Sequence, residues 1–341
     1  MPAPSAAFWA CARSGNTAAS IQARESAIQP DVTFLIAAYN AEASLPRAIR
    51  SALDQESVDV EVIVVDDRSQ DGTAAAARAI GDDRVRVIEL PDNRGPGGAR
   101  NAGLAEARGT FIAILDSDDD VLPGRLARIV ARAEAMKADV VVDNLEVVQE
   151  TTGRRETMFD EVFLAGLDEI SLADFIGSNV IFRSEFNYGY MKPVFRRSFL
   201  AEHGIRYDES LRIGEDYIFL ASALACGARC VVEPAAGYVY HIRSGSISRV
   251  LDLRHVANML AADIAFENAH PLDPAAREAQ RRRTRSLKRA TSYLTLIQHL
   301  KGRAAFKAAR VALSDPLALP LLRMPIEVRL RRLIGQTHAG L

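Results

Sequence analysis

The feature that most constrains this chain is a short apolar run that ends abruptly in carboxylates, at residues 111–120. Its letters are FIAILDSDDD, so five apolar residues are followed by four aspartates within five positions. Such an apolar run is typical of a strand buried on both faces, as in a parallel sheet. The carboxylates would then lie at the carboxyl end of the strand, where open α/β sheets bind ligands. Because crowded carboxylates repel one another, a hard divalent cation is their simplest partner, and a solvated acidic turn is the alternative.

A regular alternation of strands and helices surrounds this run. Expected strands cover residues 32–38, 60–65, 85–90 and 111–115, and expected helices cover 43–54, 73–80 and 99–107, the last after a glycine-rich loop at 95–98. This rhythm predicts an α/β fold with a mostly parallel central sheet flanked by helices. Further on, the pattern predicts helices over 123–136, near 172–177 and over 215–227, and strands over 139–145, 229–233 and 238–241.

The charge of the chain is unevenly spread. Its net charge is −2, but residues 271–341 hold fifteen Lys/Arg against four Asp/Glu, a local net charge of +11. An acidic body and a basic end are therefore expected. We predict three parts: a disordered segment over residues 1–30, a ligand-binding domain over 31–250, and a helical basic region over 251–341.

The basic end allows two interpretations. Residues 281–289 are strongly basic, and residues 316–335 mix Leu, Ile and Met with four arginines. They form either a solvated helix packed on the domain or an interfacial segment on an anionic membrane. The sequence contains no unbroken run of about 18 apolar residues, so no membrane-spanning helix is predicted. Nucleic acid is not expected as a partner, because aromatic residues do not interleave the basic ones.

Composition also bears on the compartment. The three cysteines follow no metal-ligand or disulfide pattern, and the N-terminal residues lack the apolar core of a secretory signal. We therefore expect a cytoplasmic protein, either free or peripheral on the inner face of the plasma membrane.

Polar residues gather at the carboxyl ends of three predicted strands. They are Tyr39 after the first, Asp66 and Asp67 after the second, and Asp116 to Asp118 after the fourth. A ring that stacks on a base, a carboxylate that accepts from a base N–H, and a metal that neutralises a pyrophosphate together suit a nucleotide. The alternatives are a packed tyrosine at a strand end and an aspartate that caps the following turn.

Three further segments carry candidate groups. The glycine-rich loop is not a dinucleotide fingerprint, because its last glycine is replaced by Arg100, which either reaches the ligand or lies on the surface. Its glycines let the backbone pass close to a ligand or another strand. Glu215 and Asp216 open a helix and could cap it or supply a base. His241 precedes a flexible Arg- and Ser-rich stretch that could close over phosphates, although a lone histidine is more often structural.

In order and spacing, these segments resemble the family-2 inverting glycosyltransferases with the GT-A fold. The resemblance runs from about residue 32 to 248 and is carried by FLIAAYNAEASLPRAIRSALDQ, EVIVVDDRSQDGT, NRGPGGARNAGLAEARGTFIAILDSDDD, and RIGEDYIF followed by YHIRSGSIS. It implies a GT-A nucleotide-binding fold for residues 31–250 and a nucleotide-sugar donor, often a UDP-sugar.

The resemblance also implies roles for residues that would hold the nucleotide. Ala37, Tyr39 and Asp67 would hold the nucleobase, and Arg100 would lie near the nucleotide. Position 37 is often Thr, Pro or Ser in such motifs, so alanine leaves only backbone groups there for the base.

For the metal and the reaction, the resemblance assigns a second set of residues. Asp116-Ser117-Asp118 matches the family's D-x-D motif, in which Asp118 would ligate Mn²⁺ or Mg²⁺ and Asp116 would contact the ribose or a metal-bound water. Asp216 takes the place of the catalytic base, with Glu215 beside it, and His241 falls where some relatives place a metal or phosphate contact.

The acceptor and the rival functions follow from the same resemblance. The pattern is most similar to bacterial succinoglycan-type glucosyltransferases, which implies a carbohydrate or lipid-linked glycan acceptor in exopolysaccharide synthesis. One alternative is a sugar nucleotidyltransferase, but residues 39–42 lack the glycine-rich, lysine-containing loop it would need after the first strand. The other is a catalytically inactive module that binds carbohydrate or nucleotide on the same fold.

Overall fold

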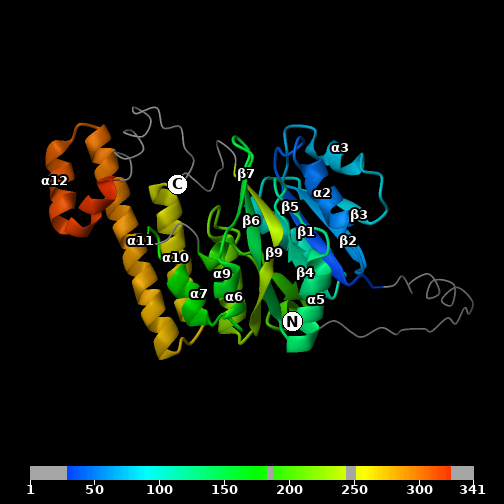
Figure 1. Ribbon diagram of the computed structural model, residues 1–341. Helices are drawn as coiled ribbons and strands as arrows, with labels where there is room; N and C mark the ends of the chain where they lie inside the picture. The colour runs from blue at the N-terminus through cyan, green and yellow to red at the C-terminus, as the bar shows by residue number, and fades with distance from the viewer. Residues whose placement is uncertain (1–28, 183–186, 243–250, 324–341) are drawn as a thin grey trace, which may run out of the picture.

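The computed structural model describes residues 29–182, 187–242 and 251–323. Within these residues, nine strands form one sheet in the order β3-β2-β1-β4-β8-β6-β9-β5, with β7 paired to β6 outside this path. Figure 1 shows the sheet with helices packed against it and the C-terminal helices α10–α12 extending to one side. The predicted disordered segment lies almost entirely outside the described residues, as does the Arg- and Ser-rich stretch after Ile242.

The first half of the chain confirms the predicted alternation. Its parallel strands are β1 (Val32–Ala38), β2 (Val60–Asp66), β3 (Val85–Glu89) and β4 (Phe111–Ile114), and its helices are α2 (Leu45–Leu53), α3 (Thr73–Arg78) and α4 (Gly95–Glu106). Nearly every side chain of β1, β2 and β4 is buried, because helices cover both faces of this half of the sheet. A β-carbon at Gly103 would lie 2.0 Å from Leu35, so glycine lets α4 lie directly on β1.

The glycine-rich segment differs from its prediction. Residues 95–98 are the first turn of α4 rather than a loop. The helix begins there because the Asp67 carboxylate accepts from the N–H groups of Arg94 and Gly95, and Pro96 suits an initial turn. A β-carbon at Gly97 would lie 3.1 Å from the Asp208 carbonyl oxygen. The glycine thus allows close approach of another backbone segment, but that segment is the connection between α8 (Arg197–Glu202) and α9 (Glu215–Ala225) rather than the expected strand.

The second half makes the sheet mixed. It contributes β5 (Asp120–Val121), β6 (Val140–Gln149), β7 (Arg154–Thr157), β8 (Val194–Arg196) and β9 (Cys230–Ile242). Strand β8 runs antiparallel to both β4 and β6 and was not predicted, because three residues are too short to show a period. The two strands expected over 229–241 are one strand, β9. Its register against β6 shifts between residues 233 and 238, where Pro234 interrupts the apolar pattern.

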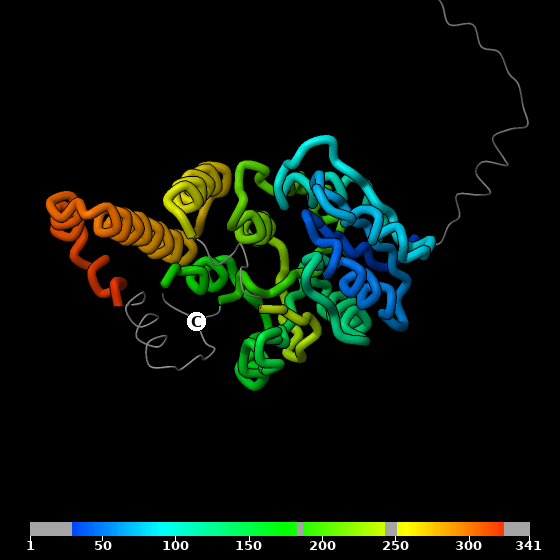
Figure 2. The backbone as a smooth tube through the Cα atoms, turned by 90° about the horizontal axis from the view of Figure 1, so that it is seen from above, coloured from blue at the N-terminus to red at the C-terminus, as the bar shows by residue number. Residues whose placement is uncertain are grey.

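Helices of the second half pack around this sheet. They are α5 (Arg125–Met136), α6 (Glu161–Ala165), α7 (Leu172–Ser178), α8 (Arg197–Glu202), α9 (Glu215–Ala225), α10 (Leu253–Ala269), α11 (Pro274–Lys301) and α12 (Ala305–Ser314), with 3-10 turns η1 (Tyr188–Tyr190) and η3 (Pro316–Leu322). The helices expected near 123–136, 172–177 and 215–227 are thus confirmed. Seen from above in Figure 2, α10–α12 lie at the opposite end of the molecule from β3.

The basic C-terminal region is anchored to the domain by a buried arginine. Arg283 of α11 places its Nε 2.9 Å from Asp263 of α10, donates to the carbonyl oxygen of Asn179 at 2.9 Å, and lies 3.5 Å from the ring centroid of Tyr217. The interpretation of a basic helix packed on the domain is confirmed for α11, although Arg283 itself is not solvated. In the described part of the chain, no helix is both long enough and apolar enough to cross a bilayer.

Candidate active site

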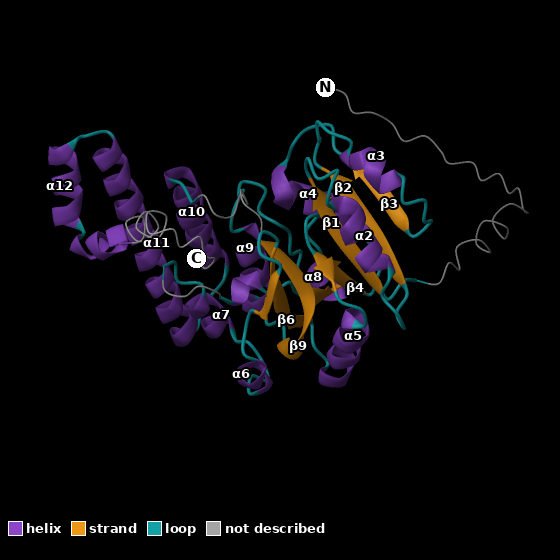
Figure 3. Cartoon of the chain, turned by 45° about the horizontal axis from the view of Figure 1, so that its top comes forward, coloured by secondary structure: helices purple, strands orange, loops and turns teal. Residues whose placement is uncertain are grey.

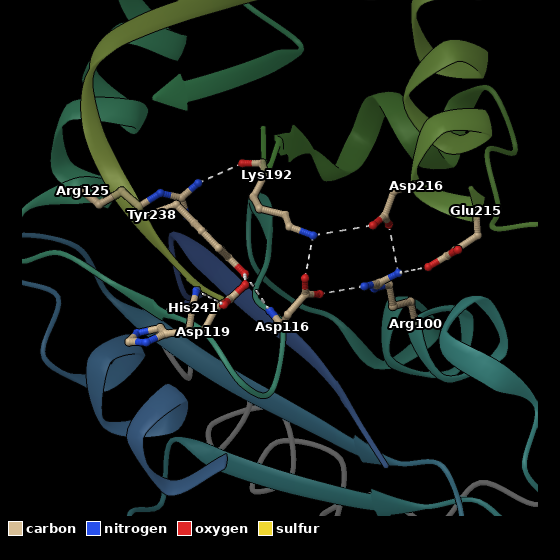
Figure 4. Close-up of polar contacts among 9 residues, drawn as sticks. All are labelled: Arg100, Asp116, Asp119, Arg125, Lys192, Glu215, Asp216, Tyr238 and His241. Atoms are coloured by element: carbon tan, nitrogen blue, oxygen red, sulfur yellow. Dashed lines mark hydrogen bonds and ion pairs between the residues drawn. The ribbon is translucent and has the colours of Figure 1, made fainter. Parts of the chain in front are cut away.

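One buried arginine joins three carboxylates from two other parts of the chain (Figure 4). Arg100 of α4 donates from Nη1 to Glu215 and Asp216, each at 2.9 Å, and from Nη2 to Asp116 at 2.8 Å. Asp116 follows β4, and the two acids open α9 after Gly214, whose φ of 89° directs the chain into that helix. Only 5% of Arg100 is exposed, so the surface interpretation of this arginine was wrong.

Lys192, which the sequence analysis did not single out, completes the cluster. Its Nζ lies 2.6 Å from Asp116 Oδ2 and 3.7 Å from Asp216 Oδ2, and its side chain is largely buried. Figure 4 shows the lysine between the two carboxylates. The available signal was a single lysine followed by Pro193 and the apolar Val194-Phe195 pair, in a segment whose pattern could not be assigned. Asp116 of the D-x-D motif and Asp216 of α9 therefore both contact the same two cationic side chains, Arg100 and Lys192.

The electrostatics of the cluster separate its carboxylates. Burial would raise the pKa of Asp116, but Lys192 and Arg100 outweigh burial and lower that pKa to about 2. Burial opposes the charge of Lys192, yet Asp116 and Asp216 raise its pKa above the usual value. Burial and the adjacent Asp216 raise the pKa of Glu215 against the opposing Arg100. Asp116 is thus ionised at neutral pH, and Glu215 holds its proton more tightly than an ordinary glutamate.

The third aspartate of the acidic run has a structural place. Asp119 is almost completely buried and accepts hydrogen bonds from the Tyr238 hydroxyl at 2.8 Å and from the backbone N–H of His241 at 2.9 Å. The Tyr238 oxygen in turn accepts from the backbone N–H of Asp116 at 3.1 Å. Burial, followed by the charges of Asp116 and Asp118, raises the pKa of Asp119. This network ties the acidic turn to β9.

Asp118 is the residue of the D-x-D motif that could hold a metal ion. Both carboxylate oxygens of Asp116 already contact cations, and across the described ranges no three His, Cys, Asp or Glu side chains gather as a ligand set. Magnesium is commonly held by one or two carboxylates together with substrate phosphates, and manganese prefers similar oxygen ligands. The partly exposed Asp118 fits that mode, in which a diphosphate supplies the remaining ligands.

His241 lies away from this cluster. Its Nε2 is 3.3 Å from Asp120, its Nδ1 is 3.4 Å from Glu150, and Figure 4 shows its ring directed away from Asp116. These contacts favour the structural interpretation of this histidine. Its role as a metal ligand stays a prediction.

The candidate nucleobase residues lie at the ends of two neighbouring strands. Ala37 pairs with Val65 in the parallel register of β1 and β2, so Tyr39 and Asp67 follow at the same end. Tyr39 is 46% exposed, which leaves its ring accessible to a base. Burial raises the pKa of Asp67, against the two N–H groups that it accepts from at the start of α4. The structure thus brings Tyr39 and Asp67 together, but Asp67 contacts the backbone of α4 rather than the Arg100 side chain.

Asp66, the neighbour of Asp67, caps the turn that follows β2. It accepts from the backbone N–H of Ser69 at 3.2 Å and from the Ser69 hydroxyl. The expectation that one aspartate of this pair caps the turn is confirmed.

Comparison with known structures agrees with the predicted fold. S. aureus TarS 1–349 in complex with UDP-GlcNAc matches with a TM-score of 0.62 at 20% identity, covering 84% of this chain and 92% of that one. The mannosyltransferase PcManGT from Pyrobaculum calidifontis, in complex with GDP-Man and Mn²⁺, matches with a TM-score of 0.56 at 18% identity, covering 89% and 81%. At these identities the likeness concerns the fold, and it confirms the GT-A architecture.

Comparison of sequences gives the family. A model described as glycosyl transferase family 2 matches residues 33–199. The succinoglycan biosynthesis protein ExoO of Rhizobium meliloti (strain 1021) is 58% identical over 307 residues, which cover 90% of this chain and 88% of that protein. The chain therefore belongs to glycosyltransferase family 2 and is a glycosyltransferase.

Proposed function

We propose that this protein is a metal-dependent inverting glycosyltransferase that moves a sugar from a nucleotide-sugar, in the first place a UDP-sugar, to a sugar hydroxyl. The observation that carries the proposal is the meeting of Asp116, from the D-x-D motif, and Asp216, from the start of α9, on the single guanidinium of Arg100. A diphosphate-binding motif and a partly exposed carboxylate across from it are the two parts that such a transfer needs.

In this mechanism Asp216 is the general base. Its side chain is one-third exposed, so an acceptor hydroxyl can approach it, whereas Glu215 is buried. Asp216 takes the proton of that hydroxyl while the oxygen attacks the anomeric carbon from the face opposite the diphosphate, which inverts the configuration. Arg100 and Lys192 fix the carboxylate relative to Asp116. Because no glycosyl–enzyme intermediate forms, one base is sufficient.

The donor would lie along the carboxyl ends of β1, β2 and β4. Tyr39 and Asp67, with backbone groups of Ala37, would hold the base, and Asp116 would face the ribose. Asp118 would hold Mn²⁺ or Mg²⁺, which when bound neutralises the charge of the departing diphosphate. The Mn²⁺ of the PcManGT complex supports a metal at such a site.

The acceptor we propose is a lipid-linked glycan of exopolysaccharide synthesis. The name of ExoO as a succinoglycan biosynthesis protein supports this class of product, and the 58% identity supports a related acceptor. A sugar nucleotidyltransferase finds no support in the family comparison. An inactive binding module remains the second candidate function. The hydrolysis assay below distinguishes it from an active transferase.

A panel of nucleotide-sugars tests the proposed function. We expect one of the UDP-sugars to be hydrolysed in the presence of Mn²⁺ or Mg²⁺ and not after EDTA treatment, measured as release of free nucleoside diphosphate. UDP with Mn²⁺ should also raise the thermal unfolding midpoint, since a ligand at 100 times its Kd stabilises the folded state by about 2.7 kcal/mol. Stabilisation without any hydrolysis would favour the inactive module, and neither effect with any nucleotide would contradict the proposal.

Replacing Lys192 should slow the reaction. Among the described residues, Lys192→Met leaves Arg100 as the one cation that Asp116 and Asp216 still share, and a hydrogen bond to a charged group is worth about 1.5–3 kcal/mol. We therefore expect kcat to fall by roughly 10- to 100-fold, with partial recovery in Lys192→Arg. Lys137→Met, at the exposed end of α5, is the matched control and should keep normal turnover. Equal turnover in Lys192→Met and wild type would exclude a positioning role for Lys192.

A further inference from the structure

The C-terminal end of the described chain carries a concentration of exposed apolar side chains. Of the ten large hydrophobic residues that are exposed in the described ranges, five lie between residues 300 and 319: Leu300, Phe306, Leu313, Leu317 and Leu319. Large exposed apolar patches on soluble proteins mark interaction sites more often than isolated exposed residues do. This cluster is named the α12 face below.

Helix α12 is amphipathic in a way that its intramolecular packing does not use. Ala308 is buried against the rest of the C-terminal helices, whereas Phe306 and Leu313 are 86% and 81% exposed. Residues seven apart lie on the same stripe of an α-helix, so these two side chains point outward together. Leu317 is also exposed, and it belongs to η3, the turn that packs on α11 and α12. The side that would normally cover a core therefore faces away from the protein.

The charges around the α12 face are mostly positive. Residues 301–323 contain one acid, Asp315, and five basic residues that are all exposed: Lys301, Arg303, Lys307, Arg310 and Arg323. Arg310 lies between Phe306 and Leu313 on the same stripe, four residues after one and three before the other. A surface that combines apolar side chains with a cationic surround complements an anionic lipid interface.

The position of α12 in the molecule suits a flat partner. It packs on the end of the 28-residue helix α11 and lies farthest from the sheet (Figure 3). At 1.5 Å per residue, Lys301 lies roughly 27 Å along α11 from the buried Arg283 that fixes this helix to the domain. A surface that docks on α12 therefore leaves the Arg100 cluster accessible to its substrates.

We propose that the α12 face docks the protein on an anionic membrane surface, with Phe306, Leu313 and Leu317 inserted among the lipids and the surrounding Lys and Arg side chains on the headgroups. This inference goes beyond the proposed function and does not depend on the donor or the metal. It extends the expected interfacial segment, residues 316–335, back to α12, and residues 324–335 of that segment lie outside the described part of the chain.

Co-sedimentation of the full-length protein with vesicles tests this inference. We expect binding to vesicles of mixed phosphatidylglycerol and phosphatidylcholine, and little binding to phosphatidylcholine alone. Phe306→Ser/Leu313→Ser should weaken the binding by about tenfold or more, because two large apolar side chains are no longer buried. Lys307→Glu/Arg310→Glu should weaken binding to the anionic vesicles by at least about fivefold for each charge.

A matched control lies on α6. Val162 and Phe163 are likewise exposed, but an acidic residue, Glu161, precedes them. Val162→Ser/Phe163→Ser should bind vesicles as wild type does. Hydrolysis of the nucleotide-sugar should be unchanged in Phe306→Ser/Leu313→Ser, so a failure of docking is separable from a failure of the proposed function.

Three results would overturn the docking proposal. The first is vesicle binding by Phe306→Ser/Leu313→Ser that equals the wild type, and the second is no binding by the wild type at all. The third is a wild-type dimer, detected by sedimentation without vesicles, that this double variant converts to a monomer. That result would assign the α12 face to contact with a second copy of the chain.

Discussion

Asp216→Asn is expected to reduce turnover by about 10²- to 10⁴-fold, the range that a general base contributes. The amide has the same shape as the carboxylate, and its oxygen can still accept from Arg100, which lies 2.9 Å away in the native protein. It cannot take a proton from the acceptor hydroxyl. Donor binding should change little, so UDP with Mn²⁺ should raise the unfolding midpoint of the variant nearly as much as that of the wild type.

Glu209→Gln is the matched control for this substitution. Glu209 is also a carboxylate held by an arginine, Arg94, at 2.7 Å, but it lies at an exposed position outside the Arg100 cluster. Its removal should leave kcat within about twofold of the wild type, as expected for a surface ion pair of small energy. If Asp216→Asn kept a turnover close to that of Glu209→Gln, another residue would have to be the base.

The parallel half of the sheet was predicted well because its strands are buried on both faces and therefore consist mostly of apolar residues. Strand β2 is buried at every position from Val60 to Asp66, so apart from Glu61 it appears as an apolar run up to Val65, with turn residues after it. The antiparallel half gave weaker patterns. Strand β8 has three residues, and β9 is interrupted by Pro234, where its register against β6 shifts.

The candidate site was predicted in part, for a related reason. Asp116 and Asp216 could be found because each stands in a short motif at the end of a strand or the start of a helix. For Arg100, a position on the surface and a position in the site were equally good predictions. A single arginine in a helix does not indicate which face of that helix is buried. Lys192 could not be identified from the sequence. Only the fold shows that the residues before β8 place this lysine between two carboxylates that are distant in the chain.

A buried ion pair holds the backbone that carries Lys192. Arg125 of α5 donates to Asp143 of β6 through two parallel contacts of 2.7 and 2.8 Å, and both side chains are almost completely buried. The same guanidinium donates to the carbonyl oxygen of Lys192 at 2.9 Å. A β-carbon at position 237 would lie 2.4 Å from the Asp143 carboxylate, so Gly237 leaves room for the pair. The pair thus connects the core of the mixed sheet with the backbone that carries Lys192.

Arg125→Met should lower the free energy of unfolding by about 3–5 kcal/mol, because it leaves the Asp143 carboxylate buried without a partner. Urea denaturation measures this loss. The double variant Arg125→Met/Asp143→Leu should regain most of the stability, since leucine has nearly the shape of aspartate and needs no partner in an apolar environment. Arg132→Met on the same helix removes only a contact of 3.9 Å to Glu233 and should cost less than about 1 kcal/mol.

The double variant also separates stability from positioning. It leaves no unpaired charge in the core but does not restore the donor to the Lys192 carbonyl, so its turnover should stay below that of the wild type while its unfolding free energy recovers. A double variant that recovered both stability and turnover would limit Arg125 to a structural role. One that recovered neither would show that the leucine does not fit beside Gly237, and Asp143→Asn in the Arg125→Met background would then replace it as the uncharged partner.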